Sequence, residues 1–293
     1  MGLSILIPVY NFDVSALVKT LAEQLQQTGK PGEIILLDDF SDTTFQSINN
    51  QRVNFSTVKY YLNEKNEGRI TSRKKLSSLA SFENLLFLDC DSKIIHENFV
   101  ERYFAEADGS DVIVGGRVYS ATPPDCKYRL HWKYGSRRES GKQAAFMSNN
   151  FMIKKNVFEK LDFSFQLQGY GHEDSWWGIQ FKKMGIKIGS INNPVLHDAL
   201  EDSETFLKKS ENALMNLLLL EKKVGKNELK KEVKIYRWYR RLRSFGLSGL
   251  YLFKERFFHK LFYKNLSSCH PKLFYFDLYR LAYLVRLSRG NQS

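Results

Sequence analysis

Two patterns of apolar and polar positions alternate over the first hundred residues. Leu3–Val9 is apolar almost throughout, as in a strand buried on both faces, and Val14–Gln27 carries leucines four residues apart, as in a helix. The alternation continues with predicted strands over 33–37, 57–62 and 84–88 and a predicted helix over 70–81. Strands that alternate with helices indicate an α/β fold in which neighbouring strands are parallel.

The pattern is less regular after residue 116. Thr122–Lys142 is polar, with scattered basic and aromatic residues, and indicates a long loop or lid. Beyond it we expect strands over 149–153 and 186–191, a short helix over 156–161, and a helix that begins near Asp174. From Ser203 onward the pattern is helical. The chain therefore divides into a predicted α/β domain, residues 1–202, and a helical C-terminal region, residues 203–293.

Carboxylates follow two of the predicted strands. Asp38 and Asp39 come directly after one, and Asp89 and Asp91 follow another. Ligands of open α/β sheets bind beyond the carboxyl ends of the strands. Two nearby carboxylates can hold a divalent cation and leave coordination positions open for phosphate oxygens. An ordinary polar transition from strand to loop is the alternative explanation of this Asp-x-Asp pattern.

A second acidic pair follows a glycine turn. In the segment Gly169-Tyr-Gly-His-Glu-Asp-Ser-Trp-Trp-Gly178, Glu173 and Asp174 stand at the predicted start of a helix. The helix dipole stabilises an ionised carboxylate there, and such a group can serve as a general base. Helix capping would explain the acids equally well, but neither the glycines nor Trp176 and Trp177. Tryptophans beside carboxylates are typical of sugar-stacking sites, and are found still more often in protein cores.

His197 follows the last predicted strand and Pro194. A single histidine is more often structural than a metal ligand. Beside a cation at Asp91, however, a neutral imidazole would be a suitable further ligand. We therefore expect Asp91 and His197 to form a site for Mn²⁺ or Mg²⁺.

Taken in order, these residues resemble the family-2 glycosyltransferases, inverting enzymes with the nucleotide-sugar-binding GT-A fold. The resemblance implies a mixed, mostly parallel sheet flanked by helices. The resemblance covers roughly Leu3 to His197, and its landmarks stand in family order. They are Ser4-Ile-Leu-Ile-Pro-Val-Tyr-Asn11, Ile35-Leu-Leu-Asp-Asp-Phe-Ser-Asp42, Asn66-Glu-Gly-Arg69 with Arg73, Leu88-Asp-Cys-Asp-Ser92, Glu173-Asp174 and His197. The Gly-Tyr-Gly-His-Glu-Asp stretch also resembles the acceptor loop of galactosyl- and N-acetylgalactosaminyltransferases and of chondroitin-type polymerases.

The resemblance implies roles for individual residues. The nucleotide would contact Pro8, Tyr10, Asn11, Asp38 or Asp39, Arg73 and Asp89, and the metal ion would bind Asp91 and His197. Asp174 would deprotonate the acceptor hydroxyl, and the acceptor would be held by Glu173, Gly171, His172, Trp176 and Trp177. These roles imply transfer of a sugar from a nucleotide sugar, by default a UDP-sugar. The acceptor would be a hydroxyl of a glycan or lipid-linked saccharide in bacterial surface polysaccharide synthesis.

Three positions depart from the family pattern. Phe40 stands where a glycine is common, so the turn after Asp39 could differ in shape. Lys74 replaces a common asparagine after Arg73, and His172 replaces a small residue before the Glu-Asp pair, which could alter the choice of acceptor. None of the three removes a catalytic group.

Charge separates the two regions of the chain. The whole chain has 44 Lys+Arg and 32 Asp+Glu, for a formal net charge of +12. Residues 222–293 alone carry 18 bases, 4 acids and 15 of the 41 aromatic residues, whereas residues 1–221 have a net charge of −2. The mixture of cations and aromatics over 234–287 suits an interfacial anchor on an anionic membrane surface. Packing of these helices on the α/β domain is the alternative.

Two other functions fit the sequence less well. Aromatic residues among cations also suit single-stranded nucleic acid, but zinc-finger spacing and a ribonucleoprotein motif are missing, and the first 221 residues are near neutral. We therefore expect no nucleic-acid partner. A sugar nucleotidyltransferase would share the architecture, yet Pro8-Val-Tyr-Asn-Phe12 stands where those enzymes have a Gly-rich basic loop.

The cysteines and the apolar runs bear on the compartment. Cys90, Cys126 and Cys269 are odd in number and scattered, which indicates a reducing compartment and no disulfide framework. No apolar run reaches the roughly 20 residues of a spanning helix, and the start of the chain does not resemble a secretory signal. We expect a cytoplasmic protein, peripheral on the inner face of the cell membrane.

Overall fold

The computed structural model of the chain describes residues 2–51, 55–141, 146–165, 167 and 171–290. Side chains 254–257 are also outside the description. Of the predicted acceptor loop, Gly169 and Tyr170 lie outside the described residues, whereas Gly171 to Asp174 lie within them.

The chain forms two compact units. The first, the sheet unit, comprises Met1–Ser120, Glu139–Ser164 and Gln180–Ala199. The second, the helical unit, comprises Ala121–Arg138, Phe165–Ile179 and Leu200–Ser293. The last segment of the helical unit begins at Leu200, whereas the predicted boundary follows residue 202. The helical unit also includes two earlier segments of the chain.

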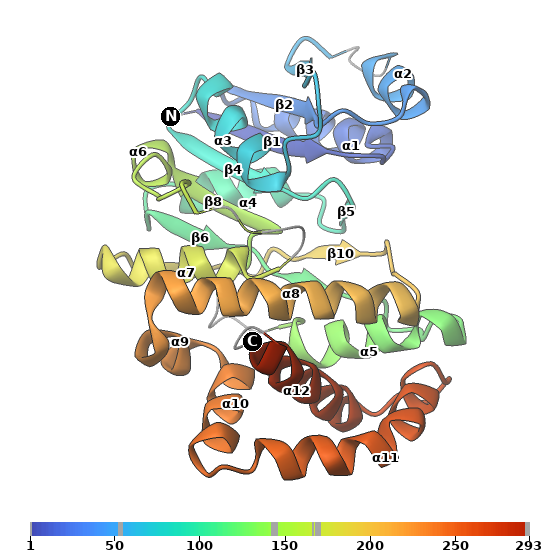
Figure 1. Cartoon of the computed structure of the whole chain (residues 1–293). Helices are drawn as coiled ribbons and strands as arrows, with labels where there is room; N and C mark the ends of the chain where they lie inside the picture. The colour runs from blue at the N-terminus through green and yellow to red at the C-terminus, as the bar shows by residue number, and fades with distance from the viewer. Residues whose placement is uncertain (1, 52–54, 142–145, 166, 168–170, 291–293) are drawn as a thin grey trace. The chain divides into compact units, whose positions relative to one another are not determined.

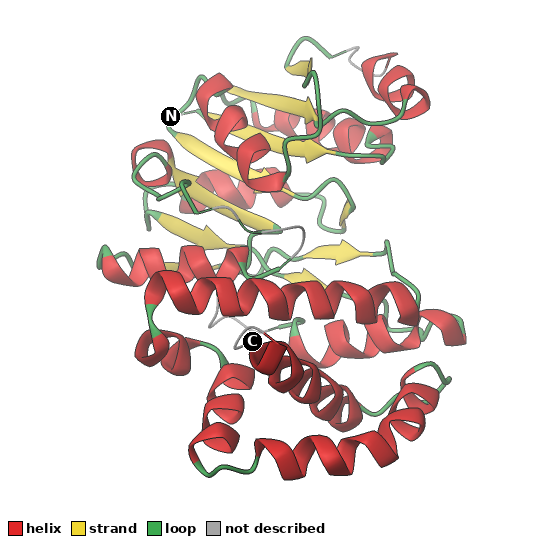
Figure 2. Ribbon diagram, viewed as in Figure 1, coloured by secondary structure: helices red, strands yellow, loops and turns green. Residues whose placement is uncertain are grey.

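The sheet unit is built on a seven-stranded sheet with the order β3-β2-β1-β4-β8-β6-β9 (Figures 1 and 2). The strands are β1 (Leu3–Val9), β2 (Gly32–Asp38), β3 (Val58–Leu62), β4 (Asn84–Leu88), β6 (Val112–Val114), β8 (Asn150–Lys154) and β9 (Ile188–Ser190). Neighbouring strands are parallel except at β8, which runs antiparallel to both β4 and β6. The sheet is therefore mixed and mostly parallel, as the family resemblance implies.

Helices cover both faces of this sheet. They are α1 (Ser15–Thr28), α2 (Thr43–Gln51), α3 (Arg69–Leu79), α4 (Phe99–Glu106) and α6 (Lys155–Phe158). Leu86 of β4 belongs to the core that α1 and α4 close with Leu21 and Phe99, while the next residue, Phe87, stacks on Phe158 of α6 with ring centroids 4.8 Å apart. Burial on both faces explains why β1 and β4 are apolar at nearly every position.

A small second sheet, with the order β5-β10-β7, lies in the same unit. Its strands are β5 (Ser92–Ile94), β7 (Arg117–Val118) and β10 (Val195–His197). β10 is antiparallel to β5, and the register sets His197 opposite Ser92. This pairing brings the end of the last strand to the Asp-x-Asp segment, although the two are far apart in the sequence.

The helical unit contains α5 (Arg129–Arg138), α8 (Ser203–Val224), α9 (Lys226–Glu232), α10 (Lys234–Ser244), α11 (Ser248–Leu266), α12 (Leu273–Gly290), the 3₁₀ turn Cys126–Tyr128 and the first part of α7 (Glu173–Lys183). The loop or lid expected over Thr122–Lys142 is wrong, because α5 occupies half of it. α5 buries Leu130, and its His131 ring stacks on Phe206 of α8. None of the described helices combines the length and the apolar character needed to cross a membrane.

A disulfide joins Cys126 to Cys269 within the helical unit. The sequence analysis expected no disulfide, because three scattered cysteines carry no pairing signal, and that expectation is wrong. The bond ties the turn before α5 to the connection between α11 and α12. Cys90 is the free cysteine, and it is partly buried beside the Asp-x-Asp carboxylates.

Candidate active site

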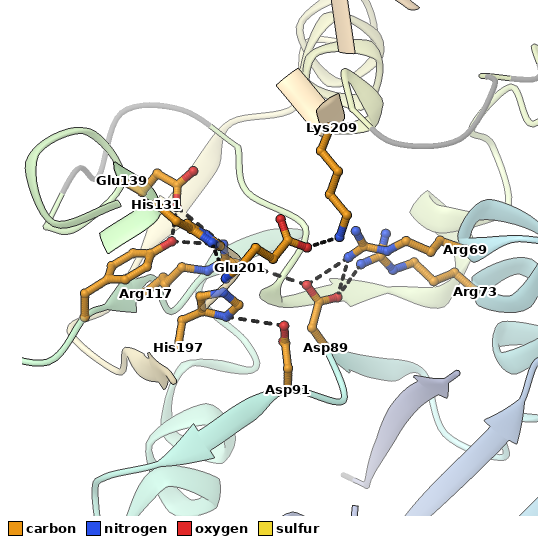
Figure 3. Close-up of polar contacts among 11 residues, drawn as sticks. Arg69, Arg73, Asp89, Asp91, Arg117, His131, Glu139, His197, Glu201 and Lys209 are labelled. Atoms are coloured by element: carbon orange, nitrogen blue, oxygen red, sulfur yellow. Dashed lines mark hydrogen bonds and ion pairs between the residues drawn. The ribbon is translucent and has the colours of Figure 1, made fainter. Parts of the chain in front are cut away.

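Asp89 follows the end of β4 and is surrounded by arginines (Figure 3). Nη2 of Arg69 donates to both carboxylate oxygens at 2.8 Å, and Nη2 of Arg73 donates to Oδ1, also at 2.8 Å. Nη2 of Arg117 lies 3.6 Å from Oδ2. Arg69 and Arg73 are four residues apart on α3, so a single helical face presents both to the end of β4.

These arginines determine the charge of Asp89. Burial by itself would raise the pKa of this carboxyl, but the charges of Arg69, Arg73 and Arg117 outweigh it and hold the pKa at about 2. Arg73 has no exposed surface, and its Nη2 also donates to the backbone carbonyl of Ser148 at 2.9 Å. Arg73 therefore positions Asp89, and the nucleotide contact implied for it by the resemblance does not fit so buried a side chain.

Arg117 extends the network on the side of the small sheet. Its Nη1 lies 3.4 Å from Oε2 of Glu139, and the Tyr119 hydroxyl donates a short hydrogen bond to the same oxygen. The three arginines around Asp89 thus balance three carboxylates, those of Asp89, Asp91 and Glu139. The cluster is close to neutral before any ligand binds.

Asp91 and His197 lie side by side, as expected for a shared metal ion. Nδ1 of His197 is 3.4 Å from Oδ2 of Asp91, and the pairing of β10 with β5 fixes this proximity (Figure 3). The other oxygen of Asp91, Oδ1, is buried and has no hydrogen-bond partner among the described residues. A buried carboxylate oxygen without a donor is costly unless a ligand satisfies it. A carboxylate oxygen suits Mn²⁺, and an imidazole nitrogen is a common ligand of transition-metal ions, although no group of three or more such ligands occurs in the described part of the chain.

Asp38 and Asp39 lie at the end of β2, and both carboxylates accept hydrogen bonds that hold the neighbouring backbone in place. Asp38 is fully buried and accepts hydrogen bonds from the backbone N–H of Ser41 at 2.7 Å and from the Tyr60 hydroxyl at 2.9 Å. Asp39 accepts from the backbone N–H groups of Glu67 and Gly68 at 2.9 and 2.8 Å, which fixes the start of α3. The second carboxylate thereby helps to place Arg69 and Arg73.

The turn after β1 leaves Tyr10 accessible. Its side chain is 52% exposed, whereas Pro8 is partly buried within the strand. Asn11 adopts a left-handed φ of 47°, and its Oδ1 accepts from the Asp42 N–H at 2.7 Å. Phe40 also has a left-handed φ, 65°, a backbone conformation that glycine adopts more readily than phenylalanine. That ring is half exposed at the same edge.

Glu173 and Asp174 form the first turn of α7 in the helical unit. Gly171 approaches α8 so closely that a Cβ would lie 2.5 Å from Cβ of Ala213, which explains this glycine by packing. Trp177 has no exposed surface and Trp176 is 4% exposed. The burial of Trp177 therefore favours a role in packing over contact with the acceptor.

His172 precedes this turn with a left-handed φ of 67°. Burial, with a smaller contribution from the nearby charge of Arg280, lowers the pKa of His172 to about 3. Its Nδ1 is 3.0 Å from the Ser175 hydroxyl. At neutral pH the side chain is an uncharged, hydrogen-bonding ring.

Sequence reasoning missed three polar residues of the sheet unit's site. Arg117 and Glu139 come from segments without a motif, and only the fold brings them to Asp89. Asn149 is not marked by a sequence motif either. Its backbone carbonyl accepts from the Asp89 N–H at 3.0 Å, and its buried side chain has no hydrogen-bond partner among the described residues.

The sequence matches the model of a family described as glycosyl transferase family 2 over residues 4–166, more than half of the chain. The chain belongs to glycosyl transferase family 2. The resemblance seen in the sequence is thereby confirmed, and with it the prediction of a glycosyltransferase at the level of the family. A comparison with curated proteins returned no match for this family 2 member.

Solved structures share the fold of this family 2 glycosyltransferase. The mannosyltransferase PcManGT from Pyrobaculum calidifontis, in complex with GDP-Man and Mn²⁺, matches with a TM-score of 0.52 and 13% identity, over 74% of this chain and 63% of its own. Glucosyl-3-phosphoglycerate synthase from Mycobacterium tuberculosis, in complex with Mn²⁺, UDP and phosphoglyceric acid, matches with a TM-score of 0.53 and 16% identity. This match covers 74% of this chain and 78% of the synthase. The chain thus spans less than two thirds of the mannosyltransferase's length. At these identities the likeness shows the fold, and it confirms the predicted GT-A architecture.

Proposed function

We propose that this family 2 member is a metal-dependent, inverting glycosyltransferase that moves a sugar from a nucleotide sugar to an acceptor hydroxyl. The observation that carries the proposal is the Asp91–His197 pair beside the arginine-bound Asp89. The buried oxygen of Asp91, which has no partner within the described part of the chain, can take up a cation. Because the charges of the surrounding arginines and carboxylates cancel, a bound divalent cation would give the site a net positive charge, which suits a nucleoside diphosphate.

Each polar residue then has a role in the transfer. A bound metal ion would neutralise charge on the diphosphate leaving group. Asp89, held ionised by its arginines, binds the ribose hydroxyls, and Asp174 accepts the proton of the acceptor hydroxyl while Glu173 holds the acceptor. The hydroxyl oxygen bonds to the anomeric carbon from the face opposite the nucleotide. The bond from that carbon to the diphosphate oxygen breaks, so the anomeric configuration inverts in one step.

The two fold neighbours were determined with GDP-Man or UDP and with Mn²⁺, which supports a nucleotide sugar and Mn²⁺ for this chain. We expect a UDP-sugar, galactose-type on the resemblance of the loop before Glu173. The acceptor is a hydroxyl of a glycan or lipid-linked saccharide in bacterial surface polysaccharide synthesis.

A thermal-shift screen tests donor and metal together. The full chain is heated with UDP-, GDP- and other nucleotide sugars, each with and without Mn²⁺. We expect a rise in Tm for a UDP-sugar only when Mn²⁺ is present, because ligand that binds the folded state alone stabilises it. A shift that is the same without Mn²⁺, or the absence of a shift with every nucleotide sugar, contradicts the proposal.

We also propose that α10 and α11 attach the protein to an anionic membrane surface. Large apolar side chains stand exposed there, namely Phe245, Leu250, Phe253, Phe258 and Leu261, with exposed fractions of 50–74%. Lys254, Arg256 and Lys260 lie among them in sequence, and Arg241 and Arg243 come just before them. Such a surface can enter the headgroup region, and each nearby cation adds about 1 kcal/mol on anionic lipid.

Co-sedimentation of the full chain with vesicles tests this attachment. We expect binding to vesicles that contain phosphatidylglycerol, weaker binding to phosphatidylcholine alone, and loss of binding in Phe253→Ser. Leu62→Ser, an exposed leucine of β3 in the sheet unit, is the matched control and should bind like the unchanged protein. Equal binding by both variants, or none by the unchanged protein, contradicts the attachment.

The proposed location is the cytoplasm, on the inner face of the cell membrane. The Cys126–Cys269 disulfide weighs against it, because reducing compartments keep most thiols reduced. Fractionation of cells that produce the tagged chain tests the location. Recovery with the membrane fraction, released by salt, is expected, and recovery from the periplasm contradicts it.

A further inference from the structure

The helical unit contains a cavity of about 610 Å³ that is open to solvent. Residues of α5, of the start of α7, of α10 and of α12 line it, among them Tyr134, His172, Lys234, Trp238, Asp277 and Arg280. Sites for small molecules have volumes of about 300–1,000 Å³. None of the residues assigned above to the nucleotide or the metal ion belongs to this lining. His172 does, and it comes from the loop that the sequence connects with the acceptor.

Charged groups in the wall are arranged asymmetrically. Arg138 donates to both oxygens of Asp277 at 2.6 Å, so each satisfies the other. The other charged residues of the lining are two cations, Lys234 and Arg280, and one carboxylate, Glu232. His172 adds no charge at neutral pH, because its pKa lies far below 7. The cavity therefore keeps a formal excess of one positive charge.

Arg280 is placed to use this excess. Its guanidinium lies over the ring of Phe276, 5.2 Å from the centroid, and its Nε is buried with no hydrogen-bond partner among the described residues. A guanidinium that lies over an aromatic ring and keeps one N–H without a partner among the described residues can still bind an anion.

The rim of the cavity is aromatic and accessible. Trp238 is 50% exposed and Phe274 is 66% exposed, and both belong to the lining. Exposed aromatic rings beside a cavity mark binding surfaces. A flat ring offers a face for the hydrocarbon side of a pyranose, while polar groups at its edge bind the substituents.

We propose that this cavity binds a sugar residue that carries a carboxylate or a phosphate, as a second subsite for the acceptor. The sugar ring packs on Trp238 and Phe274, and its anionic group is bound by Lys234 and Arg280. The assignment to the acceptor rests on the proposed glycosyltransferase function, whereas binding of the anionic sugar itself does not. The subsite would select acceptors by a charged residue at a distance from the hydroxyl that reacts.

Saturation-transfer NMR on the full chain tests the subsite. The probes are D-glucuronate and α-D-glucose 1-phosphate, with D-glucose as the neutral reference. UDP and Mn²⁺ are present in excess, so that the nucleotide site is filled and cannot account for the signal. We expect both anionic sugars to bind and to compete with each other, and D-glucose to bind at least tenfold more weakly.

Exposed residues of the rim provide variants that should fold. Lys234→Gln and Trp238→Ala should each weaken the binding of D-glucuronate at least tenfold. Lys208→Gln changes an exposed lysine of α8 outside the lining and should leave this binding unchanged. All three should bind UDP with Mn²⁺ normally, which separates this proposal from the proposed function. Equal binding of D-glucose and D-glucuronate, full binding in both rim variants, or no binding of either anionic sugar to the unchanged protein overturns it.

Discussion

Arg73 and Arg69 bind the same carboxylate, that of Asp89, from positions of very different exposure. Both place Nη2 2.8 Å from Oδ1, but the Arg73 side chain has no exposed surface, whereas that of Arg69 is 37% exposed. The two residues stand one helical turn apart on α3. The two arginines therefore share a helix, a partner and a distance to Oδ1 and differ most in burial, although Arg69 also donates to Oδ2 and Arg73 to the Ser148 carbonyl.

This pair predicts unequal losses of stability. Arg73→Met should lower the free energy of unfolding by about 3 kcal/mol, because water cannot reach the fully buried position that the guanidinium leaves. Arg69→Met should cost less than about 1 kcal/mol, because water can replace an exposed partner. Urea unfolding followed by circular dichroism measures both. Equal losses in the two variants would show that burial does not set the strength of this ion pair.

The sequence predicts the elements of the sheet unit well and its long-range contacts only in part. Strand and helix patterns around Leu3–Val9 and 84–88 are strong because both faces of the sheet are covered. The proximity of Asp91 to His197 follows from the pairing of β10 with β5, and family order alone suggests it in the sequence. Arg117 and Glu139 reach Asp89 from segments without any pattern, so only the fold could reveal them.

The helical unit shows where sequence patterns fail. α5 lacks apolar spacing because its buried positions include His131 and Gly135, so its helix does not stand out from a polar segment. The Cys126–Cys269 pair joins segments 143 residues apart, and spacing carries no information about such a bond. Trp177 illustrates the converse: a residue type typical of sugar sites is here fully buried.

His172 should make the stability of the protein depend on pH. Its pKa is about 3 in the folded chain against 6.5 for the free side chain, so below pH 6.5 the unfolded chain binds a proton that the folded chain does not. Stability should therefore fall as pH decreases from 6.5 towards 3. Between pH 7.5 and 5 this residue should account for about 2 kcal/mol.

His172→Asn should remove that contribution, since asparagine tolerates the left-handed φ. Urea unfolding at pH 7.5 and pH 5 measures the difference, and His270→Asn, an exposed histidine, serves as control. The same pH dependence in all three proteins would mean that His172 titrates like an exposed group.

The disulfide predicts a pattern of alkylation. In denaturant without reductant, iodoacetamide should modify one cysteine, Cys90, and after reduction it should modify three. Mass spectrometry counts the adducts, and Cys90→Ser should give none before reduction. Three adducts without reductant would contradict the bond. Cys126→Ser should also lower the free energy of unfolding by about 2–4 kcal/mol, because a long closed loop is released.

Asp174 should be essential for transfer and dispensable for the nucleotide. Asp174→Asn keeps the size of the side chain but removes the group that takes the acceptor proton, so turnover should fall by at least about 100-fold. Glu204→Gln, an exposed acid in the first turn of α8, is the matched control and should keep full activity. Release of UDP from a donor found in the thermal-shift screen measures turnover. Full turnover by Asp174→Asn would exclude it as the base.

Calorimetric titration of UDP with and without Mn²⁺ tests the central claim most directly, since it isolates the Asp91–His197 site from the acceptor. The unchanged protein should bind UDP at least about tenfold more tightly with Mn²⁺, a difference of roughly 1.4 kcal/mol. Asp91→Asn should lose that difference, and Asp174→Asn should keep it. Equal enhancement by Mn²⁺ in Asp91→Asn and the unchanged protein would contradict the metal site, and with it the proposed mechanism.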